Sequence, residues 1–61
     1  MNKFEVNQRV MLQYMPDKNL NGKIGKVVGF SEPGFPIVLF DDTPMGYNPA
    51  IMISEACLVG D

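Results

Sequence analysis

Few residues in this 61-residue sequence have the types and spacing that catalysis or metal binding requires. Asp41 and Asp42 are adjacent acids, and two carboxylates that share a pocket can exchange protons or bind a cation. Neighbouring residues of a strand point to opposite faces, however, and Asp-Asp-Thr-Pro is typical of a turn. Cys57 is the single cysteine, and the sequence contains no histidine that could activate it as a nucleophile. We therefore expect a chain that is not an enzyme, with no catalytic residue, metal site or cofactor.

The charge balance argues against a typical nucleic-acid-binding protein. Five basic residues against seven acidic ones give a net charge of −2 at pH 7, whereas nucleic-acid binders usually carry a basic excess. All the basic residues lie within residues 1–30, and every charged residue within 31–61 is acidic. The folded domain is therefore expected to have one basic and one acidic face. The unpaired cysteine, and the lack of an export signal or a membrane-length apolar run, favour the cytoplasm.

The elements that must position these residues are short strands. Prolines and glycines divide the chain into apolar pieces that are rich in Val, Ile, Phe and Met and too short for an ordinary helix. The length predicts one domain, residues 1–61, with a thin core. The predicted strands are 9–14, 23–30, 36–40, 50–53 and 58–59, with a loop at 15–22 and a short 3-10 turn at 54–57. The sequence therefore predicts an all-β fold.

Alternation of apolar and polar residues assigns a face to each strand. In the second strand Val28 is predicted on the core face, which leaves Gly25 and Gly29 on the opposite face. The run 36–40 is apolar throughout, so it is either buried on both sides or has one face that awaits a partner. The expected core contains Val6, Val10, Leu12, Ile24, Val28, Phe30, Ile37, Leu39, Ile51, Ile53 and Leu58.

The order of these elements resembles a five-stranded SH3-like barrel with one short 3-10 turn before the last strand. Residues 22–30, GKIGKVVGF, resemble the Gly-x-x-Gly-x-Val core of KOW-type barrels, and residues 36–42 and 53–59 resemble the next strand and the closing turn. A similar layout occurs in the ferredoxin-docking subunit of photosystem I, the variable chain of ferredoxin–thioredoxin reductase and type II dihydrofolate reductases. The resemblance covers residues 6–59 and implies the fold, which serves many functions.

The candidate site is a partner-binding surface on the loops. A small core cannot bury every aromatic and methionine side chain, and those left exposed often mark interfaces. In SH3-like barrels the groove between the loops after the first and second strands commonly binds partners. The resemblance and the expected exposure together give the partner-binding residues Tyr14, Met15, Phe35, Met45 and Tyr47, with Asp41 and Asp42 as acidic contributors.

Three functions remain open. The favoured one is a non-enzymatic protein-interaction module, such as an adaptor, assembly subunit or small inhibitor, that docks on a larger protein through its loop aromatics and acidic half. One alternative is a homo-oligomeric barrel with a ligand or active site shared between subunits, similar to type II dihydrofolate reductase; the apolar run 36–40 would favour such association. The other is a KOW-like domain that contacts RNA or DNA through Arg9, Lys18, Lys23 and Lys26, together with Tyr14.

Overall fold

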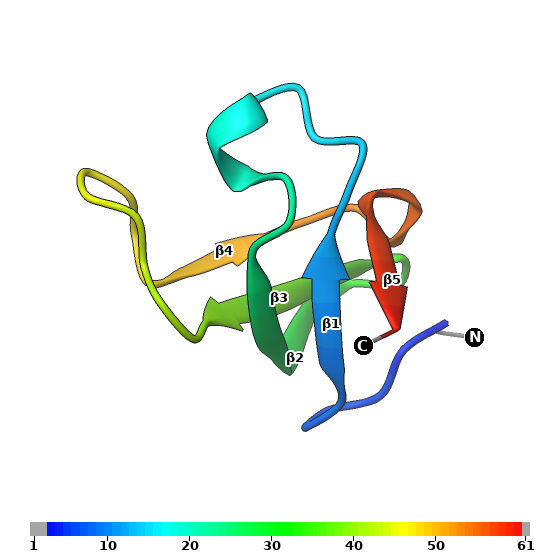
Figure 1. Ribbon diagram of the computed structural model, residues 1–61. Helices are drawn as coiled ribbons and strands as arrows, with labels where there is room; N and C mark the ends of the chain where they lie inside the picture. The colour runs from blue at the N-terminus through cyan, green and yellow to red at the C-terminus, as the bar shows by residue number, and fades with distance from the viewer. Residues whose placement is uncertain (1–2, 61) are drawn as a thin grey trace.

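The computed structural model describes residues 3–60, and it contains one five-stranded antiparallel sheet (Figure 1). Residues 1, 2 and 61 of the predicted domain lie outside the described residues. The strands are β1 (Arg9–Leu12), β2 (Ile24–Glu32), β3 (Phe35–Phe40), β4 (Ala50–Met52) and β5 (Leu58–Gly60). The all-β prediction is therefore confirmed, and each predicted strand overlaps an observed one.

The strand order is β4-β3-β2-β1-β5, so the nine-residue β2 lies at the centre of the sheet. It pairs with β1 near its start and with β3 along its length, and the register shifts between Val27 and Gly29. Such a bulge bends a strand and increases its twist. The β2–β3 hairpin turns at Pro33 and Gly34, where Gly34 has the positive φ of 86° that the Pro-Gly pair predicts. Within residues 3–60 no ladder joins β4 to β5, so the hydrogen-bonded sheet has two edges.

The 3-10 turn predicted before the last strand is present as η2 (Glu55–Cys57). Its cap is Ser54, whose hydroxyl accepts a hydrogen bond from the backbone N–H of Ala56 at 3.3 Å. A second 3-10 turn, η1 (Lys18–Leu20), lies in the segment that was predicted as a plain loop. Asp17 caps it by accepting the N–H of Asn19 at 3.0 Å, and Leu20 anchors it in the core.

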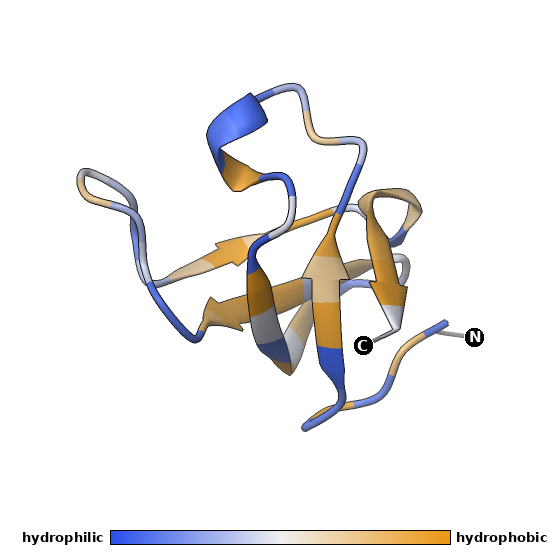
Figure 2. Cartoon of the chain, in the orientation of Figure 1, coloured by the Kyte–Doolittle hydropathy of each residue, from blue (hydrophilic) through white to orange (hydrophobic). Residues whose placement is uncertain are grey.

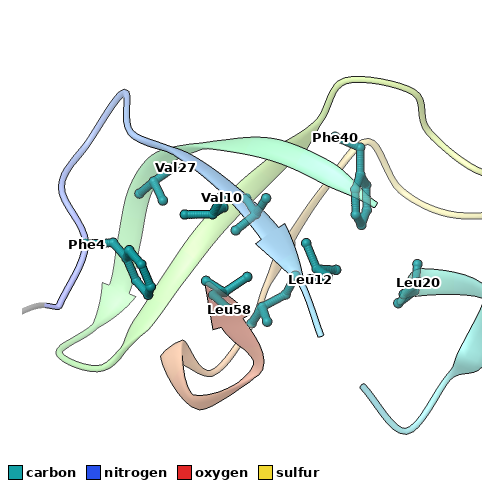
Figure 3. Close-up of a cluster of buried hydrophobic side chains, with 9 residues drawn as sticks. Phe4, Val10, Leu12, Leu20, Val27, Phe40 and Leu58 are labelled. Carbon is teal, nitrogen blue, oxygen red and sulfur yellow. The ribbon is translucent and has the colours of Figure 1, made fainter. Parts of the chain in front are cut away.

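The core is a single apolar cluster on the inner side of the bent sheet (Figure 3). Phe4 lies at one end of the cluster, beside Val27, and Leu20 lies at the other. Neither residue was predicted to be buried, because Phe4 precedes the first predicted strand and Leu20 lies in the predicted loop at 15–22. The cluster consists of Phe4, Val10, Leu12, Leu20, Val27, Val38, Phe40, Ile53 and Leu58, which confirms Val10, Leu12, Ile53 and Leu58 from the predicted core.

The face predicted for β2 is wrong. Gly25 and Val27 face the core, whereas Val28 is 41% exposed. The reason is a close approach of β2 to β3 on the inner side: a Cβ atom on Gly25 would lie 2.5 Å from the carbonyl oxygen of Leu39. Only glycine fits at position 25 on the inner face of β2, so Gly25 identifies the side of the strand that faces the core.

Two further core assignments fail for related reasons. In β3 the pairs Val27↔Val38 and Gly25↔Phe40 share the inner face, so Leu39 points outward and is 39% exposed. Val6 is also substantially exposed, and Phe4 is the residue of the segment before β1 that is buried in the core instead. The remaining predicted members, Ile24, Phe30, Ile37 and Ile51, are partly buried.

Candidate partner-binding surface

Tyr47 links the 41–49 loop to the η1 segment. Its ring packs against the core cluster, and its hydroxyl donates a hydrogen bond to the carboxylate of Asp17. This hydrogen bond, helped by the Asn19 N–H, lowers the pKa of Asp17 below its ordinary value. The same bond raises the pKa of Tyr47, because the phenol must keep its proton to donate it. Tyr47 therefore holds the 41–49 loop against the η1 segment, in addition to any role in binding a partner.

Met15 has a similar supporting position. Its side chain is partly buried and packs against the core cluster. Its backbone N–H donates to the side-chain oxygen of Asn21 at 2.8 Å, which closes the loop that carries η1. Met15 and Tyr47 thus cover the core beside the η1 segment. Because both side chains are partly buried, only part of their apolar surface is available to a partner.

Tyr14 is held by its neighbours but leaves its ring in solvent. Its φ of 60° is in the left-handed region, which costs a residue with a Cβ atom about 1–2 kcal/mol. The thiol of Cys57 donates to the Tyr14 carbonyl at 3.7 Å, and the Gln13 N–H donates to the Cys57 carbonyl at 2.7 Å. The side chain is nevertheless 76% exposed.

The other predicted site residues come from several elements. Met45, in the 41–49 loop, is 98% exposed. Phe35 is partly buried at the start of β3, where it pairs with Glu32 in the hairpin. Asp41 and Asp42 follow the opposite end of β3. The predicted site residues therefore lie at both ends of β3, in the 41–49 loop and in the segment between β1 and η1.

Asp41 forms an ion pair with Arg9, and both side chains are about half exposed. Exposed pairs of this kind contribute little to stability. A surface hollow of about 300 Å³ lies beside the pair, and it is lined by Gly22, Lys23, Ile24, Asp41 and Asp42. Arg9 comes from the basic half of the sequence and Asp41 from the acidic half, so the two charge types meet here.

An exposed apolar surface on the outer side of the sheet was missed as a candidate site. The outward residues of β2, β3 and β4 include Val28, Leu39 and Met52, which are all substantially exposed. Figure 2 shows that β3 and β4 are mostly hydrophobic. The unbroken run 36–40 was the available signal. The exposure of Leu39 shows that the run is not buried on both sides, and a partner for its outer face stays a prediction.

The described chain offers no arrangement of ligands for a metal ion. Among residues 3–60, no three His, Cys, Asp or Glu side chains come close enough together to hold one. Cys57 is partly buried and lies beside the Tyr14 carbonyl. In the same part of the chain, no helix has the length and hydrophobicity needed to cross a membrane.

Comparison of the chain with protein-family models, with curated proteins and with solved structures gives no match.

Proposed function

We propose that this chain is a cytoplasmic, non-enzymatic interaction module, an SH3-like barrel that docks on a larger protein through Tyr14. The strand order, the long bent β2 and the 3-10 turn before β5 support this fold assignment. The observation that carries the function is Tyr14, a strained residue whose neighbours are fixed while its ring stays in solvent.

The restraint on Tyr14 favours binding over simple surface exposure. Left-handed backbone in a non-glycine residue persists only where surrounding contacts impose it, and such residues are concentrated at functional sites. On one side Gln13 is tied to Cys57, and on the other Met15 is tied to Asn21. The ring is thus presented with little backbone freedom to lose on binding, which favours affinity. Tyrosine is among the residues that most often dominate interface energetics.

The titratable groups support a binding role over a catalytic one. Asp17 and Tyr47 are engaged with each other, and Asp41 is engaged with Arg9. These contacts hold loops and strands together, and each leaves its groups less available to a substrate. Asp42 remains exposed at the rim of the hollow, where it adds negative charge that would suit a basic partner surface.

The test is a binding comparison between variants of the whole chain. The immobilised wild type should retain a specific protein from a cell extract, and Tyr14→Ala should weaken that retention at least about tenfold. Val6→Ala is the matched control, because it shortens another exposed apolar side chain, in the segment before β1, whereas Tyr14 follows β1. Circular dichroism must show all three proteins folded. Equal retention by Tyr14→Ala and the wild type would exclude the Tyr14 surface, and no specific retention by the wild type would count against the module itself.

A further inference from the structure

The outer edge of β4 offers unpaired backbone groups. The N–H of Phe40 donates to the Pro49 carbonyl, and the N–H of Ile53 donates to the Pro36 carbonyl, each at 2.9 Å. Because hydrogen-bonded pairs alternate along an antiparallel ladder, Ile51 also bonds to β3. The N–H and C=O groups of Ala50 and Met52 therefore point away from β3.

This edge is only partly protected against pairing with another strand. Natural edge strands are commonly short or carry charges, proline or a covering segment. β4 is short and follows Pro49, but it carries no charge. Ala50, Ile51 and Met52 are all uncharged, and Ala50 and Met52 are exposed. At the other edge the N-terminal segment passes near β5 (Figure 1): Phe4 packs in the core with Leu58, and the Lys3 N–H donates to the Glu55 carboxylate.

We infer that β4 pairs antiparallel with β4 of a second copy of this chain, about a two-fold axis that passes beside Ile51. That register places Ala50 opposite Met52 of the second copy, and Met52 opposite its Ala50. Both residues of each pair have outward N–H and C=O groups, so each pair exchanges both backbone hydrogen bonds. Ile51 lies opposite its own copy at the non-hydrogen-bonded position between these pairs.

The side chains of β4 are complementary to themselves in this register. Leu39 lies opposite Ala50 and Ile37 lies opposite Met52 on the outer face. In the pair the long Met52 side chain lies next to the small Ala50 of the second copy, with room to reach its Leu39. Met52 is 53% exposed in the single chain and would lose part of that exposure. Large-to-small pairing across an interface is the arrangement that packs well.

Charge and area define what kind of dimer this is. Each copy carries a net charge of −2, but no charged residue lies in β4, so the contact brings no like charges face to face. Stable interfaces bury about 800 Å² per partner. A three-residue strand supplies less than that, so we expect a reversible dimer whose population rises with concentration. This surface is separate from Tyr14 and does not depend on the function proposed above.

The inference is tested by sedimentation equilibrium of the full chain from about 10 µM to about 1 mM. The wild type should change from monomer to dimer over this range. Met52→Lys should raise the dimer dissociation constant at least about tenfold, because it places a charge at the pairing edge. Met45→Lys is the matched control, since it makes the same substitution at a 98% exposed loop position and should leave the dimer unchanged.

A mixed sample of isotope-labelled and unlabelled chain identifies the surface. Intermolecular contacts between the Hα atoms of Ile51 in the two copies are expected, since non-hydrogen-bonded positions bring these atoms together. A wild type that stays monomeric throughout would overturn the inference. So would a dimer that lacks the Ile51 contact, or an equal effect of Met52→Lys and Met45→Lys, which would indicate a response to net charge alone.

Discussion

The phenol of Tyr47 donates a hydrogen bond to the carboxylate of Asp17, a residue 30 positions earlier in the sequence. The same carboxylate caps η1 through the Asn19 N–H. One acidic side chain therefore holds both the 3-10 turn and the loop that follows β3. Because Leu20 of η1 is buried in the core, this contact also helps to keep that end of the core covered.

Replacing Tyr47 by Phe should loosen the η1 segment without emptying the core. The substitution removes the hydroxyl that bonds to Asp17 and keeps the ring that packs on the cluster. We expect a small decrease in the urea midpoint of unfolding and faster amide exchange at residues 18–20. Tyr14→Phe is the control, because that side chain is largely exposed and its hydroxyl should be dispensable for stability. Equal effects of the two substitutions would show that the Asp17 contact contributes nothing.

Stability should also depend on pH through the same pair. The pKa of Asp17 is lowered in the folded chain, chiefly by the Tyr47 hydroxyl. The stability that ionised Asp17 contributes is therefore fully present above the unfolded-state pKa of about 4. It is lost as the pH falls through the lower pKa of the folded state. Asp17→Asn should remove this part of the acid sensitivity, while the amide oxygen can still cap η1. Unfolding profiles of the wild type and Asp17→Asn that stay parallel as the pH falls below about 5 would contradict this.

At alkaline pH the stability of the fold should depend on pH with the opposite sign. The pKa of Tyr47 is raised in the folded chain by its bond to Asp17, so its contribution is complete below the unfolded-state pKa of about 10. The contribution is lost as the pH rises through the higher folded value. In a spectroscopic titration at the tyrosinate absorption band, the Tyr47 step should lie at lower pH in Asp17→Asn than in the wild type, and an unchanged titration would exclude the contact.

Truncation of neighbouring valines should distinguish the two faces of β2. Val27 is fully buried and Val28 is substantially exposed. Val27→Ala removes two methyl groups from the core, and we expect it to lower the free energy of unfolding by about 2 kcal/mol. Val28→Ala should change it by less than about 0.5 kcal/mol, as is usual for surface positions. Denaturant titration of both variants checks this, and a larger loss for Val28→Ala would restore the face that the alternation predicted.

The strands could be predicted because their signals are local. Proline and glycine mark where each strand ends, and the apolar pieces between them are rich in residues that favour strands. Ser54 identified the 3-10 turn before β5 in the same way. Phe4 and Leu20 were missed because their burial depends on segments that fold back over the sheet from outside the strands. No local pattern in the sequence reports such a contact.

The candidate site was predictable only as a set of residue types. Met45 is exposed in the loop where the sequence placed it, whereas Tyr14 was expected at the end of the first strand and is exposed after β1 ends at Leu12. Loop position could not indicate that Tyr47 bonds to Asp17, because that contact joins loops that are distant in sequence. The outer face was misassigned for a different reason. The run 36–40 is apolar on both sides, so alternation alone cannot tell Val38 from Leu39.

Gly25 supplies the physical reason for the face of β2, and a pair of alanine substitutions tests it. A Cβ atom at Gly25 would lie 2.5 Å from the Leu39 carbonyl oxygen and 2.7 Å from a methyl group of Val38, so backbone and core would both have to move. We expect Gly25→Ala to cost more than about 2 kcal/mol, within the range of overpacked cores, or to prevent folding. Gly29→Ala is the matched control, because nothing lies within 4 Å of a Cβ atom there. It should retain wild-type stability, since alanine also restricts the unfolded chain. If both variants unfold at the wild-type urea concentration, the close packing of β2 against β3 at Gly25 is not what sets the inner face.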